Sequence, residues 1–547
     1  MIGRQTTVAV PKGLLWRAGL YFLILAGLLL TPFLLRPTPS SRGVSASAHL
    51  VVMTPHDQSV RFEVAEAFKA HWLKKTGELV EIDWRIPGGA SEIMLYLRSE
   101  FAARYRDFVE QGAPSGGSGS ADPQAPPTSE VFQQFIQSGA GIGVDVLFGG
   151  GAADFQQLAE AGYFDAGAEG TAFGLKAIRR DHPAWFEPSV IPEFYRGERY
   201  RDQADRWVGV VLASFGILYN RDLFLARGIP TPLRWEALAS PDLLGSLALA
   251  DPTKSGSVAK AFELMIQQHM SEALADLKQR GVPNPEPEAL AIGWRSGLAL
   301  IQRMAANARY FSDSAGKIGL EVARGDAAAG MAIDVYGRII RASVARPGGD
   351  SRLDFVLPKS GTSLSVDPVG MLVGAPHPEL ATAFMTFLLS PEGQRLWNLR
   401  PGAPGGPLRE ALRRFPIRAD LYPPSSSGDR DPAENPYQEV GGLLYHPSWT
   451  QGLFSALRFV IRVSCVEPHQ ELQAAWEAII QSGMNPRALA EMQQLSSVDL
   501  DQVRQQVVPV LKSRDKVREM TLSREMGAQF RAQYRRAAAL AANGAQP

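Results

Sequence analysis

The stretch LALADPTKSGSV, residues 247–258, contains the pattern that decides the fold. Its first four residues are apolar and suit a buried strand, and residues 251–257 form a polar loop. From Val258 to Met270 the apolar residues then recur at helical spacing. A strand that leads through a short polar loop into a helix is the repeating unit of an open α/β sheet, so this stretch predicts that class of fold.

The same unit recurs on both sides of this stretch. Apolar runs that suit strands alternate with segments of helical periodicity, and Gly, Pro, Ser and Asp residues separate them. The strands expected on this basis are residues 49–56 with their turn, 80–84, 144–148, 207–219, 247–250, 330–336 with their loop, 354–358 and 369–373, and helices are expected over 60–75, 258–270 and 378–389.

The composition excludes several classes of protein. The 547 residues are 45% hydrophobic and 20% charged, which excludes a wholly disordered chain and a multi-span membrane protein. The 56 basic residues equal the 56 acidic residues, and a net charge of zero argues against a nucleic-acid binder. Cys465 is the single cysteine, so neither an intrachain disulfide nor a cysteine-based zinc site can form.

The first 48 residues are expected to be an export signal. Three basic residues precede an apolar run over residues 18–35, and Ala46-Ser47-Ala48 supplies a cleavage site before His49. The run is also about 18 residues long, the lower limit for spanning a bilayer, so an uncleaved signal anchor in the inner membrane is the alternative. Both interpretations place the chain from His49 onward outside the cytoplasm, in the periplasm or an equivalent compartment.

Two further segments stand apart from the alternating pattern. Residues 112–128 are almost entirely Gly, Ser, Pro and Ala, which predicts a disordered surface insertion. The residues from about 497 to 542 are mostly strong helix formers, which predicts one or two surface helices. Their basic residues favour a solvated helix face over a patch that binds an anionic membrane.

The loop over residues 251–257 is the most informative candidate for ligand binding. Ser255 and Ser257 can donate hydroxyl hydrogen bonds, and Gly256 allows backbone N–H groups to approach a ligand. The following helix points its positive end at the same loop, so the combination suits a phosphate, a carboxylate or another anion. The alternative is a helix cap with a turn, which Ser-Gly-Ser satisfies as well.

Other candidate residues also follow predicted strands, where open α/β sheets bind their ligands. Gly149 and Gly150 form a loop of this kind without charge, although glycine runs are often only tight turns. His56 ends the first strand, and a lone histidine is more often structural than a ligand. Asp334 and Tyr336 point the same way if their strand continues, and they could bind a cation, ferric iron or a polyol, with a solvated strand end as the alternative.

Signals for catalysis are poor. The sequence contains neither H-E-x-x-H nor G-x-S-x-G, and its eight histidines form no close pair. Cys465 and His469 lack any partner pair, which predicts a buried thiol. The sequence therefore predicts no catalytic residues and no enzyme.

Several blocks of sequence together resemble a known family. They are VDVLFGGGAADFQQLAEAGYF from residue 144, WVGVVLASFGILYNRDLF from 207, SPDLLGSLALADPTKSGSV from 240, VARGDAAAGMAIDVYGR from 322 and LPKSGTSLSVDPVGMLVGAPHPELATAFMTFLLSPEGQRLW from 357. In their order and spacing they resemble the periplasmic solute-binding proteins of ABC importers, of the ferric-iron type and family 1. The resemblance covers about residues 49 to 400 and extends more loosely to about residue 480.

The resemblance implies a two-lobed α/β fold, the type II periplasmic-binding-protein fold, with a ligand cleft between the lobes. Lobe 1 is expected to hold residues 49–212 and 354–410, and lobe 2 residues 213–353. The chain is expected to cross twice between the lobes, near Val211–Ser214 and near Asp354. Residues 411–547 are expected to form a C-terminal helical region and extension.

The resemblance also implies functional residues. His56 lies where ferric-binding relatives place a metal ligand, Ser91, Gly149 and Gly150 lie at binding loops of lobe 1, and Ser255, Gly256 and Ser257 match the binding loop of lobe 2. Tyr336 falls near the adjacent tyrosine pair of ferric-binding relatives, but this chain has only one tyrosine there, beside Asp334. His56, Asp334 and Tyr336 would be the metal ligands if the solute were ferric iron, which prefers hard anionic oxygens.

The implied function is a monomeric extracytoplasmic receptor without a resident cofactor. It would capture a small organic anion, phosphorylated or carboxylated, or else ferric iron, and deliver it to an ABC permease and its ATPase. A polyamine or a thiamine-like cation is a further candidate solute. The alternative is a membrane-anchored extracytoplasmic sensor module that uses the same fold to signal to a partner protein.

Overall fold

The computed structural model describes residues 48–111, 130–346, 348–422, 428–432, 434–438, 442–513 and 515–543. The expected export signal, apart from Ala48, and the expected insertion over residues 112–128 lie outside the described residues. Among the helices that are described, none combines the length and hydropathy that a bilayer crossing requires.

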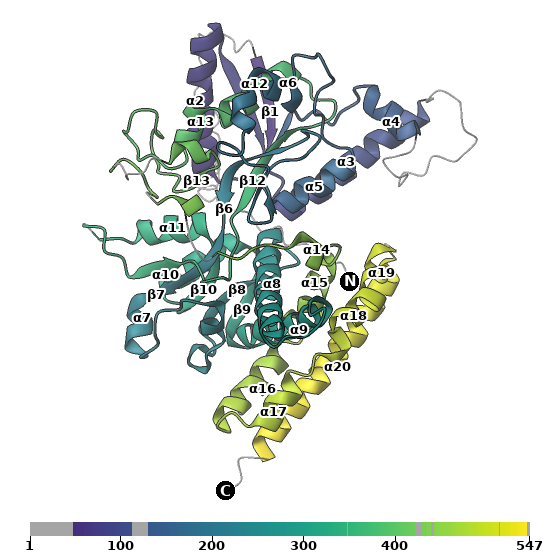
Figure 1. The fold of residues 1–547 in the computed structure, drawn as a ribbon, viewed down its shortest axis with the longest axis vertical. Helices are drawn as coiled ribbons and strands as arrows, with labels where there is room; N and C mark the ends of the chain where they lie inside the picture. The colour runs from purple at the N-terminus through teal and green to yellow at the C-terminus, as the bar shows by residue number, and fades with distance from the viewer. Residues whose placement is uncertain are drawn as a thin grey trace, which may run out of the picture. The chain divides into compact units, whose positions relative to one another are not determined.

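Two separate β-sheets, each packed against its own helices, form the framework (Figure 1). The first sheet has the order β13-β6-β12-β3-β1-β2, in which β2, β1 and β3 are parallel and β12 runs antiparallel to both β3 and β6. Its strands are β1 (Ala48–Met53), β2 (Val80–Arg85), β3 (Val146–Phe148), β6 (Val208–Ala213), β12 (Ser365–Met371) and β13 (Phe415–Pro416). We call this sheet and its helices the first lobe.

The second sheet has the order β11-β7-β10-β8-β9. Strands β10, β8 and β9 are parallel, and β7 runs antiparallel to β10 and β11. Its strands are β7 (Phe215–Asn220), β8 (Leu247–Ala250), β9 (Ala308–Ser312), β10 (Ala329–Ile333) and β11 (Leu353–Val356). This sheet and its helices form the second lobe, so the predicted two-lobed α/β fold is confirmed.

Helices follow most of the strands, as the strand–loop–helix pattern predicts. Helix α2 begins after Asp57, whose carboxylate accepts a hydrogen bond from the backbone N–H of Val60, and ends at Gly77 with φ of 78°. The first-lobe helices are α2 (Gln58–Thr76), α3 (Ala90–Glu110), α4 (Glu130–Gln137), α5 (Ala152–Glu160), α6 (Leu175–Asp181), α12 (Pro378–Leu389) and α13 (Pro391–Arg395). The second-lobe helices are α7 (Arg221–Ala226), α8 (Gly256–Gln279), α9 (Glu286–Asn307), α10 (Ala315–Arg324) and α11 (Asp334–Ser343).

The crossings between the lobes differ from the expected boundaries. The first crossing occurs at Ser214, between β6 and β7, as expected. The second does not occur near Asp354, because Asp354 pairs with Tyr219 inside the second sheet, and the chain crosses after Val356. The first sheet also continues past residue 410, since Phe415 in β13 pairs with Leu212.

A further correction concerns Asp334 and Tyr336. The expected strand over residues 330–336 ends at Ile333, and helix α11 begins at Asp334. Asp334 lies in the first turn of α11, where a carboxylate is favourable, and its Oδ1 accepts a hydrogen bond from the backbone N–H of Val335. Two residues at i and i+2 point in opposite directions on a helix, so these side chains do not share a face as expected.

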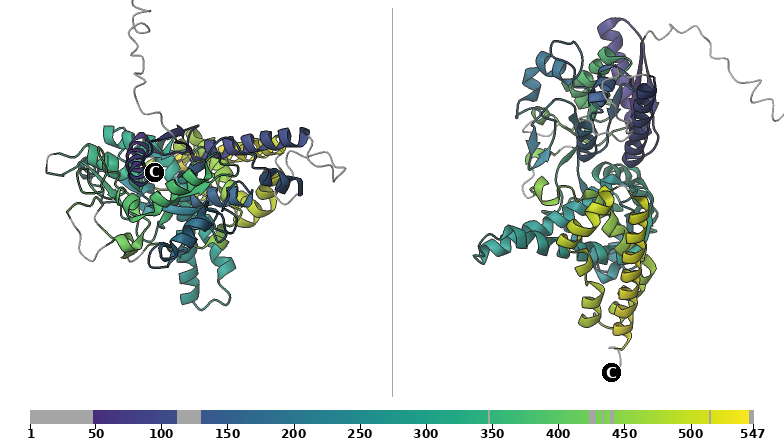
Figure 2. Two further views of the ribbon diagram at one scale, coloured as in Figure 1. Left: turned by 90° about the horizontal axis from the view of Figure 1, so that it is seen from above. Right: turned by 90° about the vertical axis from the view of Figure 1, so that its right-hand side faces the viewer.

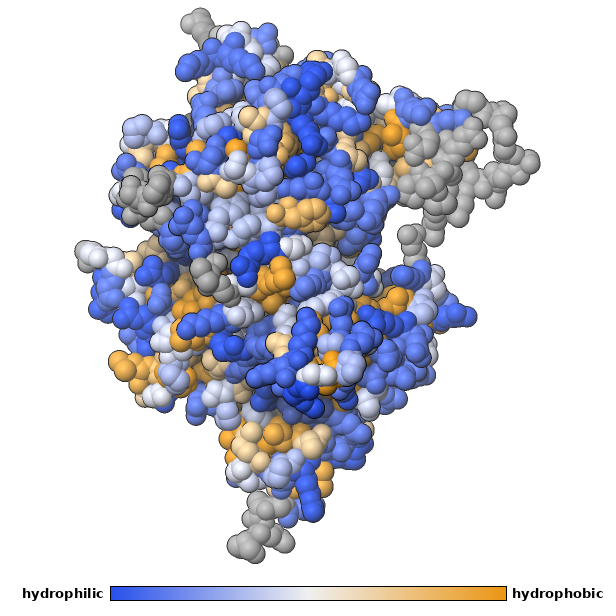
Figure 3. Space-filling view, viewed as in Figure 1, coloured by the Kyte–Doolittle hydropathy of each residue, from blue (hydrophilic) through white to orange (hydrophobic). Residues whose placement is uncertain are grey.

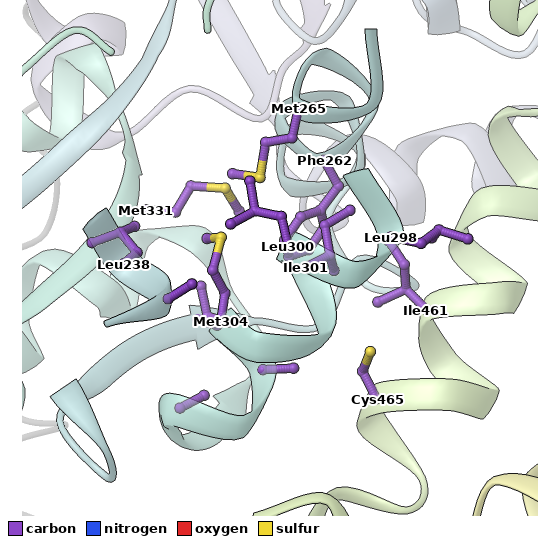
Figure 4. Packing of buried hydrophobic residues seen from close by; sticks show 14 of the residues in the cluster. Leu238, Phe262, Met265, Leu298, Leu300, Ile301, Met304, Met331, Ile461 and Cys465 are labelled. Carbon is purple, nitrogen blue, oxygen red and sulfur yellow. The ribbon is translucent and has the colours of Figure 1, made fainter. Parts of the chain in front are cut away.

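Each lobe has its own hydrophobic core. The second core contains Leu238 from the loop before β8, Met265 and Phe262 from α8, and Met304 from α9 (Figure 4). Cys465 belongs to the same core, and burial raises the pKa of its thiol to about 12. The predicted buried thiol is therefore confirmed.

The C-terminal helices complete the core of the second lobe. The chain passes from Tyr437, which packs against the first core, to Leu443 in the second core, and this is a third crossing between the lobes. In Figure 2 the longest C-terminal helix, α20, runs beside α16 and α17, and these helices pack together. The C-terminal elements are α14 (Pro447–Thr450), α15 (Phe454–Ile461), α16 (His469–Gln481), α17 (Pro486–Met492), α18 (Leu500–Gln502), α19 (Val508–Lys512) and α20 (Lys516–Asn543).

The basic residues of α20 form ion pairs with neighbouring helices. Arg535 contacts Glu471 on α16 at 3.0 Å, and Arg536 contacts Glu491 on α17 at 2.8 Å. These pairs agree with the predicted solvated helix face. The face of the molecule in Figure 3 is mainly hydrophilic, and its apolar residues lie in separate patches.

Candidate ligand-binding cleft

A cavity of about 830 Å³ lies between residues of the two lobes. Its first-lobe wall comes from the loops after β1, β2 and β3, from the hairpin of β4 (Phe194–Tyr195) and β5 (Glu198–Arg199), and from β12. Its second-lobe wall comes from the loops that lead into α8, α10 and α11. The cavity lies beyond the carboxyl ends of the parallel strands and has the volume of a small-molecule site.

The structure brings together most of the residues that the sequence predicts for a site. The predicted residues that line the cavity are His56, Gly150, Ser255, Gly256, Ser257 and Tyr336. Three others stand behind this lining: Ser91 follows the lining residue Ala90, Gly149 lies against His56, and Asp334 is fully buried.

His56, which lines the first-lobe wall, and Gly149 behind it form a packed pair. The His56 ring lies 4.6 Å from the Phe148 ring, centroid to centroid, and its Nε2 points at Gly149. A Cβ atom on Gly149 would stand 2.4 Å from that nitrogen. Burial lowers the pKa of His56 well below its ordinary value, and the charge of Arg414 lowers it further. A neutral, packed imidazole fits the structural interpretation of this histidine.

Arg414 is a buried, positively charged residue of the cavity wall that the sequence pattern did not predict. It is almost fully buried, and its Nη2 lies 2.6 Å from Oδ2 of Asp367 on β12. Burial raises the pKa of Asp334, and the charge of Arg414 opposes that rise. Burial also raises the pKa of Tyr336, and the nearby Asp57 adds to the effect. A protein guanidinium therefore pairs with Asp367 and also acts on Asp334, the one carboxylate that was predicted to meet a metal.

The residues predicted for ferric iron do not fit that ion well. The Nε2 atom of His56 faces Gly149, and Asp334 does not line the cavity. In the described part of the chain, the single cluster of three His, Cys, Asp or Glu ligands consists of Glu236, His269 and Glu272. Arg234 pairs with both glutamates, so an arginine already neutralises the negative charge that would attract a metal ion to that cluster.

The N-terminus of α8 has the predicted cap. The Oγ of Ser255 accepts a hydrogen bond of 3.3 Å from the backbone N–H of Val258, so the capping alternative describes this side chain. The carboxylate of Asp154, from α5 of the first lobe, stands opposite: its Oδ2 is 3.6 Å from where a Cβ on Gly256 would lie. Burial raises the pKa of Asp154, against the charge of Arg458. A first-lobe carboxylate thus faces the positive end of a second-lobe helix.

Helices α3 and α5 begin at the cavity with small residues. Gly89 precedes α3 and Gly151 precedes α5, and neither helix has a side-chain cap among the described residues. Both glycines line the cavity, as do Ala90 and Ala152 in the first turns. The first N–H groups of a helix have no partner within the helix, so small residues here bring positively polarised backbone to the cavity wall. Each first turn also carries a carboxylate that lines the cavity, Glu92 on α3 and Asp154 on α5, and Asp154 accepts a hydrogen bond from the backbone of Gly151.

The charged side chains of the cavity wall are mostly paired within the protein. Lys260 on α8 lies 3.3 Å from Glu198 on β5 and 3.0 Å from Glu263, and Lys317 lies 2.6 Å from Asp313. Burial alone would lower the pKa of Lys260, but the two glutamates outweigh burial and raise it. Lys254 is exposed at the rim and forms no ion pair with the residues that the structure describes.

Part of the wall comes from the C-terminal region, which sequence reasoning treated as an extension. Tyr445, Pro447 and Phe454 line the cavity. The resemblance stops being clear near residue 400, so nothing in the pattern marked these residues. The Asp154 side chain had a usable signal, because it lies in the quoted block that follows β3 and opens a helix.

Part of the chain is similar to known proteins. Residues 180–421 match the family model described as bacterial extracellular solute-binding protein. Curated relatives from Salmonella typhimurium and Salmonella typhi, both named phosphoglycerate transport regulatory protein PgtC, are 27% identical over 190 residues. That stretch covers 35% of this chain and 40% of the relatives' own length.

Solved structures show similarity at low sequence identity. Iron-bound HitA from Pseudomonas aeruginosa is 16% identical, covers 76% of this chain and 99% of its own, and has a TM-score of 0.45. The periplasmic binding protein AfuA from Actinobacillus pleuropneumoniae, with exogenous fructose-6-phosphate bound, is 17% identical, covers 64% of this chain and 81% of its own, and has a TM-score of 0.41. Residues 180–421, a little under half of the chain, are thus similar to the bacterial extracellular solute-binding proteins.

Proposed function

We propose that this protein is an extracytoplasmic receptor that captures a small organic anion between its two lobes and delivers it to an ABC permease and its ATPase. The observation that carries the proposal is the cavity of about 830 Å³ onto which α3 and α5 open with uncapped, small-residue first turns. Such helix ends favour a phosphate or a carboxylate. The family assignment supports both the extracytoplasmic location and a binding role without turnover.

The electrostatics of the wall support an organic anion over ferric iron. Arg414 compensates Asp367 on β12, so this carboxylate of the first-lobe wall is already paired with a cation of the protein and is poorly prepared for a trivalent cation. Lys254 adds an exposed positive charge at the rim.

The crossings supply the hinge that such a receptor needs. Ser214 joins β6 directly to β7, and the backbone N–H of Phe215 donates a hydrogen bond of 3.1 Å to Oγ1 of Thr362 in the second crossing. The two crossings therefore lie together. A solute that contacts both lobes shifts the population toward the closed arrangement.

A thermal unfolding screen tests the proposal. The full chain is titrated with phosphoglycerates, fructose 6-phosphate, citrate and ferric salts. A solute at about 100 times its Kd should stabilise the protein by about 2.7 kcal/mol. Stabilisation by an organic phosphate or carboxylate supports the proposal, and stabilisation by ferric salts alone contradicts it.

Two variants separate the solutes further. Lys254→Gln should weaken binding of an organic anion, whereas Lys278→Gln at the far end of α8 is the matched control. Tyr336→Phe should abolish any phenolate-to-iron colour if iron binds, and should weaken binding of an organophosphate only modestly.

A sensor function is the second candidate, favoured by the printed name of the Salmonella relatives, which describes a transport regulatory protein. Reconstitution distinguishes the two. Solute-dependent stimulation of ATP hydrolysis by an ABC importer supports delivery. Solute-dependent change in the autophosphorylation of a membrane histidine kinase, without stimulation of an importer, supports signalling.

A further inference from the structure

A short C-terminal segment from Tyr445 to Arg458 reaches the cleft. It lies beyond the family-model match, which ends at residue 421. The segment follows the third crossing and contains α14 and α15, and Leu457 within it is buried in the second core. It is anchored to α8 by a reciprocal pair: the N–H of His446 donates to Oε1 of Gln267 at 2.8 Å, and Nε2 of Gln267 donates to the His446 carbonyl at 2.9 Å.

Arg458 on α15 contacts both lobes. Its Nε donates a hydrogen bond of 2.8 Å to the carbonyl of Pro252, and its Nη2 donates to the carbonyl of Thr253. These carbonyls belong to the loop before α8, in the second lobe. The same Nη2 lies 3.4 Å from Oγ of Ser91, in the first turn of α3 in the first lobe. A single guanidinium therefore joins the α8 loop to the start of α3.

The charges around Arg458 come from both lobes as well. Asp154 and Glu92 on the first lobe, and Asp251 on the second, all act on its charge. Asp154 also faces the N-terminus of α8, with its Oδ2 3.6 Å from where a Cβ on Gly256 would lie, so Arg458 stands beside a contact between the two lobes. A positive side chain between carboxylates of opposite lobes favours the closed arrangement.

The start of the segment supports a second contact between the lobes. The Lys260 ammonium lies 3.4 Å from the centroid of the Tyr445 ring and 3.3 Å from Glu198 of the first lobe. The Tyr445 hydroxyl donates a hydrogen bond of 3.1 Å to Glu263. Tyr445 therefore fixes the lysine that reaches across the cleft, and Arg458 reaches across it directly.

We propose that the segment from Tyr445 to Arg458 is a clasp that holds the two lobes closed, and that Arg458 is its positioning residue. The role of the clasp rests on the proposed function, because closure of the lobes would retain the solute in the cleft. Arg458 orders the loop that presents Lys254 and Ser255, and ties that loop to α3. A purely local role of Arg458, confined to the 252–253 carbonyls, is the competing explanation.

The distance between the lobes tests the clasp without any solute. Spin labels are placed by Leu73→Cys on α2 and Leu225→Cys on α7, which are 45% and 83% exposed, in the full chain. The native Cys465 is buried, so the spin label should react only with the two introduced cysteines. Pulsed electron paramagnetic resonance should show a longer and broader distribution of distances between the two labels for Arg458→Gln and for Ser91→Ala than for the parent protein.

Binding provides the second readout, with the anion found in the thermal screen as probe. Losing one long hydrogen bond between the lobes should weaken binding about 3- to 10-fold in either variant. The double variant should be no weaker than Arg458→Gln alone, because both changes remove the same contact. Arg462→Gln is the matched control, since Arg462 pairs with Glu467 and Glu519 inside the C-terminal helices.

Unchanged lobe distances in Arg458→Gln and Ser91→Ala would overturn the clasp, even if Arg458→Gln lowers the melting temperature as much as Arg462→Gln does. The distance measurement needs no ligand. If no anion binds but the distances respond, the proposed function fails while the clasp stands, so the two failures are distinguishable.

Discussion

The His56 ring packs so closely against Gly149 in the first lobe that it leaves no space for a side chain at that position. Gly149 has φ of 89°, and a Cβ atom there would stand 2.4 Å from Nε2 of His56. Gly149→Ala should therefore lower the free energy of unfolding by about 2–4 kcal/mol, from backbone strain and the clash together. Gly143→Ala is the control: its φ is 73°, but a Cβ atom there would have nothing within 4 Å. Equal losses in urea unfolding would show that His56 moves aside without cost.

His56 should also make stability depend on pH. Burial lowers its folded-state pKa well below the ordinary value of 6.5. As pH falls through about 6.5 the unfolded chain binds a proton that the folded state refuses, so stability is lost, by up to about 1.4 kcal/mol per pH unit. His56→Asn removes this contribution. Urea unfolding at pH 7.5 and 5.5 should show a smaller loss in the variant, and identical losses would contradict the assignment.

Among the secondary-structure elements, α2 holds the loop that leads to Arg414. Glu63 on α2 is buried, and its carboxylate accepts backbone hydrogen bonds from Leu408, Arg409 and Glu410 at 2.5, 2.7 and 2.9 Å. Glu63→Ala should cost about 2–4 kcal/mol in urea unfolding, because three donors lose a charged acceptor. Glu66→Gln, which removes a surface pair with Lys69, should change stability by less than about 1 kcal/mol. A loss that small in Glu63→Ala would mean that the loop is held by other contacts.

The elements themselves follow closely from the sequence where the pattern is local. The strand over residues 247–250 occurs as expected, because its apolar residues and its polar loop are adjacent in the chain. The pattern fails at Asp334, where an apolar strand continues into a helix without a Gly or Pro between them. It fails again at Arg414, whose partner Asp367 is distant in sequence, so that no spacing rule can join the two.

At the scale of the whole molecule, the two lobes were predictable and their closure was not. Each sheet arises from strands with strong local signals, and the family resemblance supplied their division into lobes. The contacts that span the cleft join hairpin β4–β5, α8 and the C-terminal segment. Lys260, Glu198 and Tyr445 carry no motif, and their meeting depends on the tertiary fold.

The ion pair between Glu198 and Lys260 should bias the whole molecule toward closure. Glu198 is buried in the first lobe and accepts a hydrogen bond of 2.5 Å from Ser363 in the second crossing, and Lys260 belongs to the second lobe. Glu198→Gln leaves Lys260 with Glu263 alone, so the open arrangement should gain about tenfold in population, or about 1.4 kcal/mol. Small-angle scattering of the ligand-free protein should show a larger radius of gyration. Glu193→Gln on the preceding turn, whose partners Arg199 and Arg201 lie in the same lobe, is the control. A scattering profile that matches the parent, despite lowered unfolding free energy in Glu198→Gln, would restrict the pair to a structural role within a fixed arrangement of the lobes.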